Sequence, residues 1–270
     1  MGLILGMQCV QDNSFPRDAV RQARLADLVV DPRWVYQFKL VTTTYLPGLP
    51  AHPQLPGVVA AARMRGAALE AISSESVTSA LFSVSKKDSL DHAHFDVRTG
   101  RDSSPSLSIR SNARWRVPED ADVDTAGASW VELQHAIIET LGVTHAVIVT
   151  ATNEYVLNAE IWLSLTSVDG TVMHPRPDEI SSYAARSHLL GDKYVRRPRW
   201  GTYLKPAHVA AVGGRDRILD VVKPPVVRDI GELLYIQLSE RVSESTGDAA
   251  KVRYRAFADL VAPITMPPEG

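Results

Sequence analysis

Pairs of strand-like segments joined by short turns most limit the folds that this chain can adopt. Three pairs are predicted, at residues 77–85 with 91–98, 145–150 with 155–166, and 226–230 with 233–238. The turns between them are too short for a crossover connection, so the two strands of each pair must run antiparallel. A short strand is also predicted at residues 1–7, and β-branched and aromatic residues favour another at residues 34–45. The sequence therefore predicts a predominantly antiparallel sheet.

Amphipathic or alanine-rich segments between the strands predict flanking helices. These helices are expected at residues 17–31, 58–72, 129–141, 207–212, 216–222 and 249–260. Ser129 and Glu132 match a capping box, which predicts that the third helix begins at Ser129, and Gly142 is expected to end it. Strand pairs intermixed with helices indicate the α+β class. We expect one α+β domain over residues 1–270, and a division into two packed subdomains (about 1–125 and 126–270) is left open.

Composition narrows the class of protein and its compartment. The formal net charge of −2 and pI near 6.4 differ from the strongly basic balance of a general nucleic-acid binder. Cys9, the one cysteine, cannot form an internal disulfide, which suits a reducing compartment such as the cytoplasm. No run of about 18 apolar residues is present, so we expect no transmembrane helix and no membrane partner.

One cluster has the residue types of a metal site: Asp91, His92, His94 and Asp96. On a strand, alternation places His92, His94 and Asp96 on one face, where imidazole nitrogens and a carboxylate could converge on zinc. No further ligand is marked in the sequence, so a polar strand facing solvent is favoured over a metal site. We therefore expect no resident metal.

Catalytic motifs are otherwise absent from the sequence. Ser83 and Lys86 match the spacing of a serine nucleophile with a lysine base, but a strand would point the two side chains to opposite faces. Signatures for phosphate-binding loops, zinc proteases and standard serine hydrolases do not occur. The sequence predicts no catalytic residue and no cofactor, and hence a protein that is not an enzyme.

Two charged segments are candidates for binding. Residues 193–200 mix cations with aromatics, a composition that contacts nucleic acid or anchors a protein partner. Residues 119–124 form an acidic stretch, too mixed for a helix, that could dock on a basic partner surface. For each segment the plain alternative is a solvated loop, with Trp200 packed inward in the first.

Three stretches of the C-terminal quarter, at residues 199–214, 235–240 and 254–264, share a pattern with a known family. They resemble bacterial immunity proteins in which a Trp-Gly-x-x-Leu segment leads into a helix with paired glycines, then a strand pair and a closing helix. The resemblance is to the immunity-52 type of polymorphic-toxin and type VI secretion systems. The motif positions, which we interpret as structural, are Trp200, Gly201, Leu204, Gly213 and Gly214.

The resemblance implies a cytoplasmic protein that neutralises a cognate protein toxin by stoichiometric binding. The residues hypothesised to contact the toxin are Asp120, Asp122, Asp124, Arg196, Arg197 and Arg199. Two alternatives remain: a metal-dependent hydrolase built on Asp91, His92, His94 and Asp96, and a nucleic-acid-binding accessory protein, which the charge balance disfavours. The toxin, the subfamily and the oligomeric state are left open by the sequence.

Overall fold

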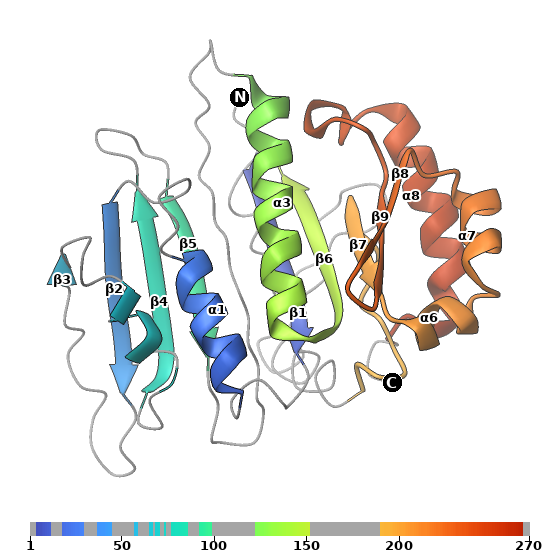
Figure 1. Cartoon of the computed structure of the whole chain (residues 1–270). Coiled ribbons are helices and arrows are strands. Elements are labelled where there is room, and N and C mark those ends of the chain that lie inside the picture. The colour runs from blue at the N-terminus through green and yellow to red at the C-terminus, as the bar shows by residue number, and fades with distance from the viewer. Residues whose placement is uncertain are drawn as a thin grey trace, which may run out of the picture.

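The computed structural model shows an α+β protein with two antiparallel sheets (Figure 1). In the strands before residue 100 the structure describes the backbone alone. The residues that it describes are 4–11, 18–29, 37–44, 57–58, 65–66, 68–70, 73, 77–85, 92–98, 122–151 and 190–266. The predicted strand at 155–166 lies outside them, as does Asp120. Residues 145–148, expected from the sequence to pair with that strand, pair instead with residues 7–10 on one side and 201–204 on the other.

The larger sheet has five strands in the order β1-β6-β7-β9-β8, all antiparallel. The strands are β1 (Ile4–Gln11), β6 (Val143–Ala151), β7 (Gly201–Leu204), β8 (Val226–Ile230) and β9 (Leu233–Gln237). The hairpin of β8 and β9 is as predicted, and Gly231 in its turn has a positive φ of 56°. Tyr203 and Tyr235 are direct partners between β7 and β9, which places two aromatic rings at the centre of the sheet.

The smaller sheet has four strands in the order β3-β2-β4-β5. The strands are β2 (Gln37–Thr44), β3 (Gly57–Val58), β4 (Val77–Ser85) and β5 (His92–Arg98). Antiparallel pairing of β4 with β5 confirms the predicted strand pair. Residues 65–66 and 68–70 are helical as expected, but Val58, predicted in the same helix, lies in β3 and pairs with Lys39.

Helices flank the sheets. They are α1 (Ala19–Val29), α3 (Val123–Leu141), α6 (Pro206–Ala211), α7 (Arg215–Val222) and α8 (Asp248–Val261), with 3-10 turns η2 (Val242–Glu244) and η3 (Ala262–Ile264). Figure 1 shows α3 lying along β6 and β1, with α1 beside it and α7 and α8 grouped beyond the β8–β9 hairpin. None of the helices in the described ranges is long and apolar enough to cross a membrane.

The start of α3 differs from the prediction. The helix begins at Val123, so Ser129 and Glu132 lie inside it and the predicted capping box is wrong. Asp122 is the N-cap, and its carboxylate accepts hydrogen bonds from the backbone amides of Asp124 (3.0 Å) and Thr125 (3.3 Å). These bonds satisfy free amides of the first turn about two helical turns, or seven residues, before the predicted cap at Ser129. The acidic stretch, thought too mixed for a helix, therefore supplies the beginning of one.

The C-terminal segments follow the sequence pattern closely. Pro206 opens α6, and Gly213 and Gly214 after it take φ values of 98° and 94° that side chains rarely adopt. Gly142 ends α3 in the left-handed conformation, as predicted. The buried face of α8 carries Ala250, Phe257 and Val261. Val252, predicted on that face, is exposed, because it lies two residues past Ala250 and so about 200° around the helix.

The expected division near residue 125 stays a prediction, with one constraint from the topology. β1 pairs with β6 along its length, so residues 4–11 belong to the sheet of the C-terminal half. Arg24 of α1 also forms an ion pair with Glu139 of α3 at 3.5 Å. Segments on both sides of residue 125 are thus built into one sheet and one helix pair.

Gly127 is expected to be required where α3 meets η2. A Cβ at this position would lie 3.1 Å from Val242 Cβ and closer still to its Cγ2. Overpacking of this kind costs about 1–3 kcal/mol, which exceeds the ~1 kcal/mol that alanine gains over glycine in a helix. Gly127→Ala should therefore lower the free energy of unfolding, measured by urea denaturation.

The matched test is the same substitution in a Val242→Ala background. With the valine methyls removed, Gly127→Ala should be neutral or stabilising, giving a favourable coupling in the double-mutant cycle. Equal destabilisation in both backgrounds would show that the close approach of Gly127 to Val242 is not the cause.

Candidate functional site

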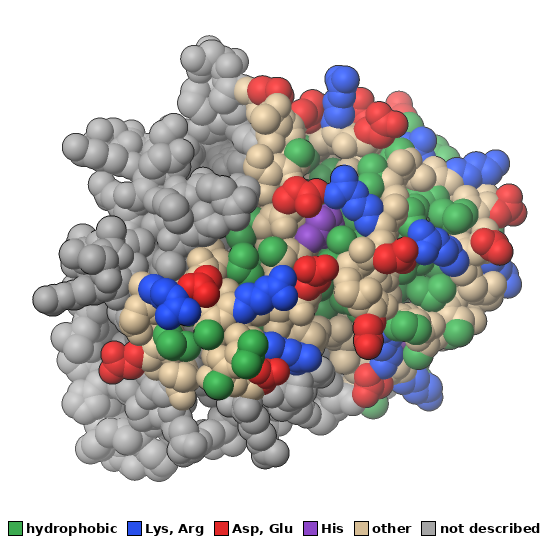
Figure 2. Space-filling model, viewed as in Figure 1, with side chains coloured by type: hydrophobic (Ala, Val, Ile, Leu, Met, Phe, Trp, Pro, Cys, Tyr) green, Lys and Arg blue, Asp and Glu red, His purple; other side chains and the backbone are tan. Residues whose placement is uncertain are grey.

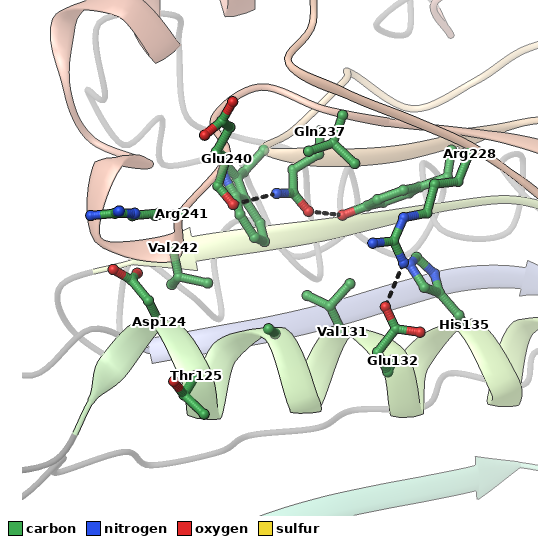
Figure 3. Close-up of a pocket in the computed structure, with 14 residues that line it drawn as sticks. Asp124, Thr125, Val131, Glu132, His135, Arg228, Gln237, Glu240, Arg241 and Val242 are labelled. Carbon is green, nitrogen blue, oxygen red and sulfur yellow. Dashed lines mark hydrogen bonds and ion pairs between the residues drawn. The ribbon is translucent and has the colours of Figure 1, made fainter.

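A pocket of about 340 Å³ lies between the first half of α3, the β8–β9 hairpin and the segment that leads into η2 (Figure 3). Figure 2 shows a histidine in the hollow between α3 and the hairpin, surrounded by acidic and basic side chains. The residues that line the pocket are Asp124, Thr125, Ala128, Val131, Glu132, His135, Trp200, Val226, Arg228, Tyr235, Gln237, Glu240, Arg241 and Val242.

The floor of the pocket is held by a chain of hydrogen bonds. Tyr235 Oη donates to Gln237 Oε1 (2.7 Å), and Gln237 Nε2 donates to the carbonyls of Ser239 (2.7 Å) and Glu240 (3.2 Å). Trp200 Nε1 donates to Ser239 Oγ at 2.7 Å. Burial raises the pKa of Tyr235, so the phenol stays protonated and can donate. Because each of these polar groups is bonded within the fold, the floor has a fixed shape.

His135 is the buried polar residue that joins this floor to α3. Its side chain lies 2.9 Å from Tyr203 Oη through Nδ1, and its ring packs edge-on against Tyr235 at 4.6 Å between centroids. His135 is 5% exposed, and Nε2 has no hydrogen-bond partner among the described residues. Burial lowers the pKa of His135 to about 4, with smaller opposing effects of Glu132, which raises it, and Arg228, which lowers it. The imidazole is therefore neutral at pH 7.

An ion pair spans the rim of the pocket. Arg228 Nη1 of β8 donates to Glu132 Oε1 of α3 at 2.5 Å, and Figure 3 shows this contact bridging helix and hairpin. Both side chains are about half exposed, at 51% and 59%. An exposed pair of this kind adds little stability, typically below ~1 kcal/mol. The carboxylate of Asp124, also at the rim, accepts hydrogen bonds from the backbone amide and the hydroxyl of Ser243, each at 2.9 Å.

Trp200 and Gly201, interpreted from the sequence as structural, both lie in the packed interior. The indole is buried and bonded to Ser239. A Cβ on Gly201 would lie 3.0 Å from Ile148 Cβ and 3.0 Å from Tyr235 Oη, so glycine lets Tyr235 pack across β7. Leu204, at the end of the same strand, is fully buried.

The arginines expected on a solvated loop are largely inside the protein. Arg196 is 1% exposed and Arg199 is 6% exposed, so neither side chain offers the accessible surface that a direct toxin contact needs. Arg196 N donates to His145 Nε2 (3.2 Å), while Arg199 Nη1 donates to Tyr254 Oη (2.6 Å). The physical reason is that this segment pairs with the C-terminal segment through Val195, which the local sequence could not reveal. Arg197 is half-buried.

The acidic residues have structural roles. Asp122 caps α3, and hydrogen bonds from the Thr125 side chain and then from the amides of Thr125 and Asp124 lower the pKa of its carboxyl. Asp124 fixes η2 to α3 through Ser243. Both carboxylates therefore already serve the fold, although Asp122 remains exposed.

The candidate metal cluster is described only in part. His92, His94 and Asp96 lie on β5, a strand as predicted, but their side chains and all of Asp91 are outside what the structure describes. Across the side chains that are described, no three His, Cys, Asp or Glu residues come together in a way that could hold a metal ion. The metal hypothesis for β5 thus stays a hypothesis.

Sequence reasoning missed the pocket. Glu132 and His135 are one helical turn apart, and Tyr235 and Gln237 alternate on one strand, so each pair shared a face in the predicted elements. Arg228 joins them only because β8 lies beside β9 and near α3. Local spacing could have identified each of the two pairs, but it could not predict that the helix pair and the strand pair lie next to each other.

Comparison with known proteins gives a likeness of fold. No protein-family model matches the chain, and no curated protein sequence matches it. The structure is similar to a solved structure from Pseudomonas aeruginosa described as T6SS protein PA0821, where T6SS denotes a type VI secretion system. The TM-score is 0.56 at 12% sequence identity, and the match covers 97% of this chain and 73% of that one. At this identity the likeness shows a shared fold.

The neutral histidines should make the protein sensitive to mild acid. Burial holds the pKa of both His135 and His208 at about 4, below the usual 6.5. Between these values the unfolded chain binds more protons, so the stability present at pH 7 is lost as the pH falls towards 4. At pH 5 the loss is on the order of 2 kcal/mol for each histidine. Carboxylates with a lowered pKa, such as Asp122, stay ionised over this range.

The measurement is urea unfolding at pH 7.5 and pH 5, compared between the native protein and His135→Gln. The variant should lose less stability between the two pH values, because one of the two protonation events is gone. His208→Gln provides an independent second case. The same pH-dependent loss in the native protein and in both variants would contradict the assignment.

Proposed function

We propose that this protein is an immunity protein of a type VI secretion system that neutralises a cognate protein toxin by binding it. The observation that carries the proposal is the likeness in fold, over 97% of the chain, to a protein described as belonging to such a system. The resemblance of residues 199–214, 235–240 and 254–264 to immunity proteins supports the same conclusion from the sequence.

Under this proposal the protein acts in the cytoplasm as a stoichiometric inhibitor, with no catalytic step and no cofactor. It either covers the active site of the toxin or holds the toxin inactive. A standard complex buries about 1,200–2,000 Å² in total, far more than one pocket provides, so the surface around the pocket must take part. Fixed polar groups such as Gln237 and Trp200 favour such a rigid binding surface.

The hypothesised toxin contacts divide by exposure. Asp122, Asp124 and Arg197 keep accessible surface and remain in the proposal, as does Asp120, which lies outside the described residues. Arg196 and Arg199 are buried, so their contribution is to hold the segment that leads to Trp200. Burial of these two arginines also weakens the alternative of a nucleic-acid-binding patch, which needs exposed cations to reach phosphates.

The proposal predicts protection at a fixed stoichiometry. Expression of the C-terminal domain of the secreted protein encoded in the neighbouring reading frame should arrest growth of a bacterial host. Co-expression of this chain should restore growth, and the two proteins should elute together in gel filtration. Activity of the purified toxin should fall linearly and reach zero near one equivalent of inhibitor, because each molecule is consumed by binding.

The controls separate binding from chemistry and from folding. Full inhibition by a small fraction of an equivalent would indicate an enzyme acting on the toxin, and failure to restore growth would contradict the proposal. Gly201→Ala, expected to disturb the Tyr235 contact, serves as a destabilised control. Zinc content that is lost on His92→Ala with His94→Ala would favour the hydrolase alternative.

A further inference from the structure

We infer that the pocket between α3 and the β8–β9 hairpin receives a basic side chain, arginine above all, from the protein partner. The inference rests on the proposed function for the identity of that partner. The chemical class of the ligand follows from the pocket itself and is testable without the toxin.

The size and walls of the pocket suit a long side chain. Its volume of about 340 Å³ is far larger than a single water molecule needs, which leaves room for a side chain. Apolar groups of Ala128, Val131, Val226 and Val242 line it, on both the helix and the hairpin sides. An arginine can lay its aliphatic stem on such walls while its guanidinium reaches polar groups.

The charges of the lining residues favour a cation. The lining includes three carboxylates but only two guanidinium groups. The carboxylates belong to Asp124, Glu132 and Glu240, and the guanidinium groups to Arg228 and Arg241. Asp124 is already bonded to Ser243, and Figure 3 shows the Glu240 carboxylate directed away from the pocket. Glu132 is therefore the carboxylate that an incoming cation would meet. Its bond to Arg228 uses Oε1, which leaves Oε2 without a partner among the described residues.

The interior holds a second polar group with no partner. His135 is only 5% exposed. Its Nε2 atom has no hydrogen bond within the described structure. A buried polar atom in this state costs free energy until a ligand satisfies it. Because the imidazole is neutral at pH 7, it does not repel a cation. Glu132 and His135 are one turn apart on α3, so one side chain can reach both.

The direct test is a titration of the full-length protein with Nα-acetyl-arginine methylamide, in which chemical shifts are measured by NMR. Saturable shifts are expected for the backbone amides of Glu132 and Arg228 and for the His135 ring nitrogens, with a Kd in the millimolar range. The citrulline analogue has the same shape without the charge and should bind at least about tenfold more weakly. The glutamate analogue should produce no saturable shift.

Variants on α3 supply a matched pair. Glu132→Gln should weaken binding of the arginine probe at least about tenfold, since the anion is lost. Glu139→Gln removes another exposed, ion-paired glutamate on the same helix and should leave binding unchanged. Unfolding midpoints of both variants verify the fold. No saturable binding of the arginine probe, equal binding of citrulline, preference for glutamate, or indifference to Glu132→Gln would overturn the inference.

The complex with the toxin domain separates this inference from the proposed function. Affinity should fall at least about tenfold with Glu132→Gln and not with Glu139→Gln. A tight complex that is indifferent to Glu132→Gln overturns the pocket inference and leaves the proposed function standing. Binding of the arginine probe by a protein that does not neutralise the toxin overturns the proposed function and leaves the pocket standing.

Discussion

The contact of His135 with the two tyrosines at the centre of the larger sheet fixes how α3 sits on the protein. Nδ1 of His135 meets Tyr203 of β7, and its ring packs on Tyr235 of β9. One turn earlier, Glu132 reaches Arg228 of β8. A single helix face thus contacts three neighbouring strands, and the pocket is the space left where the helix and hairpin diverge towards η2. This docking sets the lining residues of α3 opposite those of the hairpin.

Within residues 190–266, buried polar side chains hold segments together through hydrogen bonds. Trp200, Gln237 and Ser239 form one connected group under the pocket. Arg199 ties the chain before β7 to Tyr254 of α8. Burying such groups costs free energy unless their partners are placed accurately, so these contacts favour one arrangement over its alternatives. The resulting frame is rigid where the pocket needs it.

Much of this frame could be predicted from local patterns, because local steric rules decide it. Gly142, Gly213 and Gly214 have the positive φ values that chain reversal at a helix terminus requires. The β8–β9 hairpin is likewise predictable, because Gly231 in its turn has a positive φ. The start of α3 differs from the local pattern because Asp122, seven residues before Ser129, caps the helix, and Asp124 in its first turn is bonded to Ser243 of η2. The burial of Arg196 and the pocket depend on long-range pairing, which spacing along one segment does not encode.

We expect the floor and the rim of the pocket to respond differently to substitution, because the floor is buried and the rim is half exposed. Tyr235 is fully buried against Gly201, so changes there disturb the sheet. The Glu132–Arg228 pair is half exposed and adds little stability, so its charges can be exchanged at small cost to the fold. Under the proposed function, specificity can therefore change at the rim while the frame persists. A fold shared at 12% identity agrees with a frame that tolerates extensive substitution elsewhere.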